Sequence, residues 1–119
     1  MKKARYVPDV GHIVWLSLDP QQGREQAGRR PFLVLSPRDY NVKTSLAVGV
    51  PITSARKDYP FEVPLPSAGR VGGVALADQV KSLDWNARQA DFAEQVSPRT
   101  LRAVRTLLAT LLGLSPTAH

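Results

Sequence analysis

Apolar residues in this chain gather in short segments that are separated by Pro, Gly, Asn and Ser, a pattern typical of small β proteins. Alternating or continuous apolar runs predict strands over residues 12–19, 31–36, 46–52, 59–65, 73–80 and 81–86. Five to seven short strands of this kind predict a small barrel or sandwich. Prolines at positions 51, 60, 64 and 66 predict that parts of these strands lie at edges or bulges, because proline cannot donate to a ladder.

One helix is predicted near the C-terminus. Ser97 is a good N-cap, Pro98 suits the first helical position, and Gly113 marks the stop. An apolar stripe of Leu101, Val104, Leu108 and Leu111 should pack on the sheet or on a partner. Arg99, Arg102 and Arg105 fall on the opposite side, which we interpret as a solvated face rather than an RNA contact.

Length and composition predict a single domain over residues 1–119, with 115–119 as a loose tail. A chain of 119 residues with 43% apolar content is long enough to bury a core. It contains no cysteine, which excludes disulfides and thiolate metal ligands and agrees with a cytoplasmic location. The basic residues Lys2 and Lys3 are not followed by the apolar core of a signal peptide, and no apolar run is long enough to span a membrane.

The net charge of +6 gives a positive potential that attracts polyanions. Many basic proteins are merely soluble, so charge alone is weak support for a nucleic-acid partner. The cations gather in expected connections, where small β scaffolds carry their function. They are Arg24, Arg29 and Arg30 in one connection, Arg56 and Lys57 in another, and Lys81 and Arg88 around a third segment.

Residues 25–31 (EQAGRRP) form the most distinctive connection, with a carboxylate and two guanidinium groups. Pro31 favours an extended backbone at Arg30, so a helix cannot continue there. The segment is either an anion site with a carboxylate beside it or an ordinary solvated charged loop, and surface ion pairs of the second kind are common and weak.

The sequence offers little for metal or histidine catalysis. Its ten acidic residues are scattered, and its two histidines stand at positions 12 and 119. We therefore expect no metal site, no histidine pair and no cofactor, and we interpret His12 as a partly exposed strand residue. RNA carries its own nucleophile, the 2′-hydroxyl, so positioning and fixed positive charge can cleave it without a metal. An arginine suits the transition state but stays protonated, so Arg30 is not a candidate base.

Five motifs occur in an order that is specific to one family. They are RYVPDVG (5–11), DP (19–20), VLSP (34–37), YPFEV (59–63) and VALADQVKS (74–82). In these motifs the chain resembles, over about residues 4–113, the MazF toxins of bacterial toxin–antitoxin pairs, which are similar in fold to the CcdB gyrase poisons. The resemblance implies an SH3-like, CcdB/MazF-type barrel that is mostly β with a C-terminal helix.

The resemblance also implies the chemistry and the partners. It implies a homodimeric, metal-independent endoribonuclease that cuts single-stranded RNA, mRNA in particular, at a short sequence and so halts translation and growth. It also implies a cognate antitoxin whose acidic tail covers the basic groove. The family's essential arginine and threonine fall on Arg30 and Thr53. Its important acidic residue falls on Glu25, which either orients Arg30 or acts as a general base, and we prefer orientation because nothing in the sequence would raise its pKa.

Further residues are candidates for RNA binding: Gln26, Arg29, Ser54, Arg56, Lys57, Gln79 and Lys81. Gln79 could read a base edge, while the cations would hold phosphates. Trp15 is expected in the core rather than in a stacking role. Some relatives carry an aromatic residue near Leu18 and a histidine at the position of Arg29, so base preference and the part played by Arg29 stay open. Two alternatives remain: a non-enzymatic gyrase poison resembling CcdB, and a basic RNA-binding module without catalysis.

Overall fold

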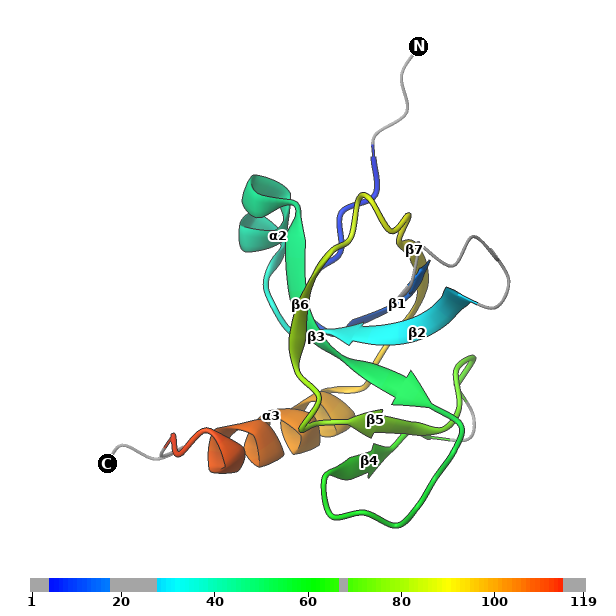
Figure 1. Cartoon of the computed structure of the whole chain (residues 1–119), viewed down its shortest axis with the longest axis vertical. Helices are drawn as coiled ribbons and strands as arrows, with labels where there is room; N and C mark the ends of the chain where they lie inside the picture. The colour runs from blue at the N-terminus through cyan, green and yellow to red at the C-terminus, as the bar shows by residue number, and fades with distance from the viewer. Residues whose placement is uncertain (1–4, 18–27, 67–68, 115–119) are drawn as a thin grey trace.

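The computed structural model describes residues 5–17, 28–66 and 69–114. Within these residues the chain forms seven strands and two helices (Figure 1): β1 (His12–Ser17), β2 (Arg29–Val34), α2 (Arg38–Thr44), β3 (Leu46–Thr53), β4 (Glu62–Pro64), β5 (Val74–Leu76), β6 (Lys81–Asp84), β7 (Asp91–Gln95) and α3 (Pro98–Leu111). The predicted class, mostly β with a C-terminal helix, is confirmed.

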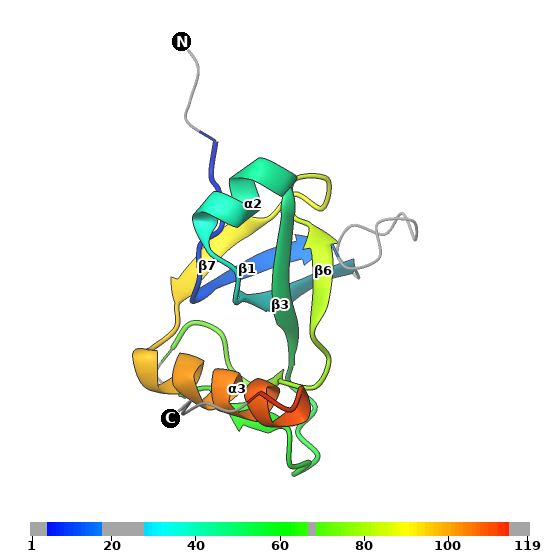
Figure 2. The same cartoon turned by 90° about the vertical axis from the view of Figure 1, so that its left-hand side faces the viewer.

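All strand pairs are antiparallel, in the order β4-β5-β3-β2-β1-β7. On the side away from β2, strand β3 pairs with two strands along its length. Residues 46–49 pair with β6, and residues 52–53 pair with β5. The two helices lie at opposite ends of the molecule, with β3 running between them (Figures 1 and 2). The strand register places the end of β1 beside the start of β2, and the end of β3 beside the start of β5.

Two of the four prolines for which the sequence predicts edges or bulges lie in strands. Pro51 lies opposite Phe32 of β2, and on its other side it stands between the part of β3 that pairs with β6 and the part that pairs with β5. Pro64 belongs to β4, the edge strand. In both positions the missing N–H interrupts little of the ladder. The expectation of edges or bulges is therefore confirmed for Pro64 and wrong for Pro51, which lies in the central strand β3, while Pro60 and Pro66 lie outside the strands.

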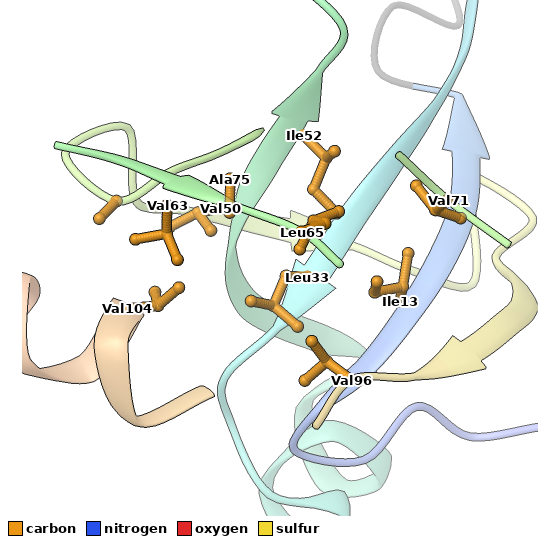
Figure 3. Close-up of a cluster of buried hydrophobic side chains, with 11 residues drawn as sticks. Ile13, Leu33, Val50, Ile52, Val63, Leu65, Val71, Ala75, Val96 and Val104 are labelled. Carbon is orange, nitrogen blue, oxygen red and sulfur yellow. The ribbon is translucent and has the colours of Figure 1, made fainter. Parts of the chain in front are cut away.

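Side chains from the two faces of the sheet enter two apolar clusters. One cluster joins Ile13, Leu33, Val50 and Ile52 to Val104 of α3 and to residues around β4 and β5. Figure 3 shows Val104 facing Val63 and shows Val71 next to Ile13. The second cluster contains Val14, Leu16, Phe32, Val34, Ala47 and Trp85. Strict alternation along β1 and β2 explains the division, because successive strand residues point to opposite faces.

Helix α3 begins and ends close to the predicted residues. The Ser97 hydroxyl accepts a hydrogen bond from the Thr100 N–H at 3.1 Å, Pro98 is the first helical residue, and Gly113 adopts a left-handed backbone with φ of 74°. Arg99, Arg102 and Arg105 are exposed, as expected for a solvated face. Only the first part of the predicted apolar stripe is covered, since Val104 is fully buried whereas Leu111 is 45% exposed.

Two elements were not predicted. Helix α2 has no apolar stripe, since Tyr40 and Val42 are exposed; it is held by the buried Asn41, whose amide donates to the carbonyls of Pro8 and Ser36. Strand β7 carries two carboxylates and only one large apolar residue, Phe92. Neither element has the apolar period by which secondary structure is recognised from sequence.

Three predicted strands are shorter than expected. The range 59–65 contains only the three residues of β4, because the Glu62 N–H donates to the Tyr59 carbonyl and closes a turn before it. The range 73–80 contains only the three residues of β5, because the Gln79 N–H donates to the Leu76 carbonyl and closes a turn after it. The range 81–86 ends as β6 at Asp84. Among the described residues, no helix combines the length and the apolar character needed to cross a bilayer.

Candidate nucleic-acid interface

The ends of β2 and β3 place the two predicted catalytic side chains in one neighbourhood. Phe32 of β2 pairs with Pro51 of β3, and continuing this register by two residues would set Arg30 opposite Thr53. Both residues also share a face of the sheet, because each is two positions from a member of that pair. The register of the central sheet therefore joins two residues that are far apart in sequence.

A groove with a volume of about 680 Å³ lies over these strand ends. It is lined by Trp15, Arg29, Arg30, Pro31, Pro51, Ile52, Thr53, Ser54, Arg70, Val71, Gly72, Leu76, Gln79 and Lys81. Four of these residues are cationic, and no Asp or Glu of the described chain is among them. A concave surface that is lined by cations and by no carboxylate raises the local concentration of anions.

Arg30 is exposed at the start of β2, and its guanidinium donates to the carbonyl of Arg29 at 3.1 Å. It makes no ion pair with any carboxylate of the described residues. Most of its five N–H donors therefore have no acceptor among the described residues. A guanidinium with free donors beside a groove is well suited to a phosphate.

Arg29 has the opposite environment, although it is the adjacent residue. Alternation turns it toward the other face, where its guanidinium donates to the carbonyls of Trp15, Arg88 and Gln89 at 3.0–3.2 Å. It also forms an ion pair with Asp91 at 2.9 Å. Arg29 therefore ties the start of β2 to β1 and to the connection before β7, and few of its donors remain for RNA.

Thr53 is the last residue of β3, as the sequence suggests, and it is half-buried. Its Oγ1 accepts a hydrogen bond from the Ala55 N–H at 3.1 Å. A hydroxyl has one donor and two acceptor sites, so this bond orients the oxygen and leaves the proton for a ligand. Gly73 has φ of 105°, and a side chain there would collide with the Thr53 carbonyl. Glycine at this position therefore allows β5 to approach the end of β3.

Gln79 and Lys81 reach the groove from the other side. Lys81 is the first residue of β6 and pairs with Gly49 of β3, while Gln79 lies in the turn between β5 and β6. Both side chains belong to exposed residues. Ser54 follows Thr53 in the lining. Four of the seven predicted RNA-binding residues thus line the groove together: Arg29, Ser54, Gln79 and Lys81.

A second hollow, of about 500 Å³, adjoins the groove, since both are lined by Thr53, Leu76 and Gln79. Lys57 and Tyr59 line this second hollow. The Tyr59 hydroxyl donates to Asp78 Oδ2 at 2.9 Å, and this hydrogen bond to a carboxylate raises the pKa of the tyrosine. The hollow therefore extends the polar surface past the end of β3.

Of the predicted site residues that the structure describes, Lys57 lines only the second hollow and Arg56 lines neither. Arg56 pairs with Asp58 at 3.2 Å on the exposed loop after β3, an ion pair of the kind that contributes little. Glu25 and Gln26 lie outside the described residues.

Two side chains of the groove lining that can contact a nucleic acid, those of Trp15 and Arg70, lie outside the predicted site. Trp15 was expected in the core, and this expectation is wrong: its side chain is 39% exposed and lines the groove. It stands opposite Pro31 near the end of β1, past the point where the core covers that face. Arg70 was not considered, and its only sequence signal is a cation within a glycine-rich segment, GRVGG at residues 69–73.

His12 confirms its interpretation as a partly exposed strand residue. Its Nδ1 lies 2.7 Å from the Tyr6 hydroxyl and accepts the Asp9 N–H at 3.2 Å. Burial lowers the pKa of the imidazole and raises that of Tyr6. In the part of the chain that the structure describes, no group of three His, Cys, Asp or Glu side chains is placed to hold a metal ion.

Comparison with known proteins assigns the family. Residues 9–112 match the family described as the PemK-like, MazF-like toxins of type II toxin–antitoxin systems. The chain is 49% identical over 110 residues to the Escherichia coli K12 protein named endoribonuclease toxin MazF, covering 92% of this chain and 98% of that one. It is 38% identical over 106 residues to the Escherichia coli endoribonuclease PemK, covering 86% and 80%.

Solved structures give the same answer. A chain of the MazE–MazF crystal structure (form II) from Deinococcus radiodurans matches with a TM-score of 0.84 and 48% identity, over 93% of this chain and all of that one. A mycobacterial endoribonuclease in complex with its cognate antitoxin matches with a TM-score of 0.75 and 28% identity, over 92% and 99%. Sequence, family model and fold agree, and the chain belongs to the PemK-like, MazF-like toxins of type II toxin–antitoxin systems.

Proposed function

We propose that this protein is the toxin of a toxin–antitoxin pair and acts as a sequence-specific, metal-independent endoribonuclease on single-stranded RNA, mRNA in particular. The relatives above are named endoribonucleases, which favours this activity over a gyrase poison. The observation that carries the proposal is the groove itself, where Arg30, Thr53 and Lys81 meet without a carboxylate in the described lining. A gyrase poison has no need for this combination.

The reaction we propose is transesterification within the RNA. The 2′-hydroxyl oxygen forms a bond to the adjacent phosphorus and loses its proton to a base, and the bond from phosphorus to the 5′-oxygen breaks. The leaving oxygen takes up a proton, so the products are a 2′,3′-cyclic phosphate and a 5′-hydroxyl end. Negative charge grows on the phosphoryl oxygens, and fixed donors that face them lower the barrier.

In this scheme the guanidinium of Arg30 holds the phosphoryl oxygens, and the Thr53 hydroxyl donates to one of them. The Ala55 N–H supports this role, because it occupies a lone pair of Thr53 Oγ1 and fixes its direction. Glu25 orients Arg30. Arg29 shapes the groove from behind, as its hydrogen bonds to three carbonyls suggest.

The remaining polar groups hold the strand. Lys81 and Lys57 contact phosphates on either side of the cleaved bond, Gln79 reads a base edge, and Ser54, Gln26 and Arg56 add contacts at the margins. Gln79 suits its role because it lines both hollows.

The partners follow from the same surface and the same family. We infer a cognate antitoxin whose acidic, extended tail occupies the cationic groove and covers Arg30, with binding that weakens as salt rises. We also infer a homodimer located in the cytoplasm; the exposed leucines at positions 111, 112 and 114 beyond the packed part of α3 are available for self-association. Light scattering of the purified protein measures this state directly.

One cleavage experiment tests the activity. The purified protein is incubated with a long single-stranded transcript in excess EDTA, and the product ends are identified. We expect cutting at a recurring short sequence with cyclic phosphate and 5′-hydroxyl ends. Arg30→Ala, prepared in parallel, should cut about 1,000-fold more slowly, so cleavage well above that level in its preparation measures contaminating nuclease. Loss of wild-type cutting on chelation, or 5′-phosphate ends, would remove the proposed chemistry.

A further inference from the structure

Arg70 is a cation of the groove for which the structure gives no internal partner. It is exposed, it lines the groove, and its guanidinium makes no ion pair or hydrogen bond with the described residues. A cation without a partner among the described residues, in the same groove as Arg30 and Lys81, adds to the mutual repulsion of the unliganded protein. An anion bound between these charges relieves that repulsion.

The backbone on both sides of Arg70 is fixed. The Arg70 N–H donates to Glu94 Oε1 at 2.7 Å, and the Val71 N–H donates to Glu94 Oε2 at 3.4 Å. Val71 is buried in the main apolar cluster, beside Ile13 in Figure 3. Gly69 lies so near Glu94 that an added Cβ would come within 2.8 Å of its carboxylate. A side chain on an anchored backbone loses less entropy on binding than one on a loose loop.

A β-bulge places Glu94 where it can hold this segment. Glu94 pairs with Ile13 and Asp91 pairs with Trp15, and the register shifts by one residue between them. Residues three apart on a regular strand face opposite sides, so the extra residue brings both carboxylates to the same face. There Asp91 holds Arg29, and Glu94 holds the 69–71 backbone.

Both carboxylates of β7 are thus used behind the groove, and neither lines it. Strand β7 supports the groove from two sides, through β2 and through the segment that enters β5, which lies below the start of β2 in Figure 1. This arrangement keeps negative charge away from the anion while it fixes the cations that face it.

We propose that Arg70 is a phosphate-contacting residue of the RNA groove and that Glu94 is the positioning residue that holds it there. The inference rests on the proposed function for the identity of the anion, a phosphate of single-stranded RNA. Arg70 acts in binding the strand and takes no part in bond cleavage, so its removal should raise KM and leave kcat unchanged.

The first experiment isolates the charge of Arg70. Binding of a labelled 30-nucleotide single-stranded RNA of random sequence is measured from 50 to 300 mM salt in the Arg30→Ala background, which slows cleavage. Arg70→Gln should weaken binding by about threefold to tenfold and reduce the log-log salt slope by about 0.7, the value for one lost contact on a single strand. In the Arg30-containing enzyme, KM should rise in the same proportion while kcat stays within about twofold.

Arg102→Gln is the matched control, because it removes the same charge from the exposed side of α3. It should leave the Kd and the salt slope nearly unchanged. If Arg70→Gln and Arg102→Gln behave alike, the proposal for Arg70 is overturned, whereas the endoribonuclease activity stands. If the wild-type protein binds RNA through Arg70 but does not cut it, the proposed function fails and this inference stands.

The second experiment separates position from charge at Glu94. Glu94→Gln and Glu94→Ala both remove the negative charge, but only the glutamine keeps an oxygen that can accept the Arg70 N–H. We expect Glu94→Gln to bind RNA at least as tightly as the parent and Glu94→Ala to bind about threefold more weakly. In the Arg70→Gln background, Glu94→Ala should have no further effect beyond about twofold. Equal affinities for the two Glu94 variants, or a full additional loss in the double variant, would overturn the positioning role.

Discussion

The polar side chains near the two ends of strand β1 differ in whether the fold gives them hydrogen-bond or ion-pair partners. At the start, Nδ1 of His12 accepts the Asp9 N–H and lies 2.7 Å from the Tyr6 hydroxyl, and the Asp9 carboxylate accepts the N–H groups of Val10 and Arg38. Near the other end, Arg30 beside the same sheet has no carboxylate partner among the described residues. Groups that satisfy one another hold a fold together, whereas groups left unsatisfied beside a hollow are prepared for a ligand.

Arg29 shows that position in the groove alone does not decide whether a cation has partners within the fold. It lines the groove with Arg30, but its donors go to three carbonyls and to Asp91. Its neighbour carries the same charge on the same strand. The difference comes from strand alternation, which turns one guanidinium toward β7 and the other away from it.

Substitution of the two arginines should give the largest effects and the sharpest contrast. Arg30→Ala should lower cleavage about 1,000-fold, since it removes the donors that face the developing charge. Its free energy of unfolding should stay within about 0.5 kcal/mol of the wild type, as for most exposed positions. Arg29→Ala should lose about 1–3 kcal/mol of stability, because it removes the hydrogen bonds that a charged donor makes to three carbonyls.

Urea unfolding and single-turnover cleavage of one transcript measure both quantities for each variant. Cleavage by Arg29→Ala is compared at a temperature where the variant is fully folded, and it should stay within about tenfold of the wild type. A stable Arg29 variant that has lost cleavage as fully as Arg30→Ala would remove the distinction between the residues.

Thr53 should give the next largest effect. Thr53→Ala removes one proposed donor and should reduce cleavage about 100-fold, with little change in RNA affinity. Thr53→Ser keeps the hydroxyl that accepts the Ala55 N–H and should recover most of the activity. If the serine and alanine variants cleave RNA equally well, the hydroxyl has no part in the reaction.

The smallest effect is expected at the satisfied end of β1, in the dependence of stability on pH. Burial lowers the pKa of His12 in the folded protein below the ordinary value of 6.5, so the unfolded chain takes up a proton first as the pH falls. Stability from this group is fully present above pH 6.5 and is lost as the pH falls toward the lowered value. Two N–H donors likewise lower the pKa of Asp9, and its contribution is lost only at more acidic pH, below the ordinary value of 3.8.

Urea unfolding between pH 7.5 and 5 measures this loss. In His12→Gln the decline over this range should be smaller than in the wild type, because the titrating group is absent. An unchanged decline would show that other groups set the pH dependence of stability. The contribution assigned to His12 at the start of β1 would then be wrong.

Much of the candidate site could be predicted because its residues lie in recognisable patterns. The apolar runs placed Thr53 at the end of a strand, and Pro31 placed Arg30 on an extended backbone. The motif VALADQVKS carried Gln79 and Lys81. The positions of these residues on strands depend on neighbouring residues alone, whereas their roles in the site are what the family resemblance implies.

Other features arise only when distant segments meet. The burial of Asn41 under Trp85, the exposure of Trp15 and the engagement of Arg29 by β7 each depend on strands packed side by side. The bulge in β7 that turns Asp91 and Glu94 to one face depends on its register with β1.

The sequence by itself determined the mostly β class, the limits of helix α3, the family and the presence of cations near two strand ends. The tertiary structure decided which of those cations have hydrogen-bond or ion-pair partners within the fold and which have no carboxylate partner among the described residues. The physical reason is that a hydrogen bond or ion pair is a property of two groups at a distance, and only strand register fixes which groups come within that distance.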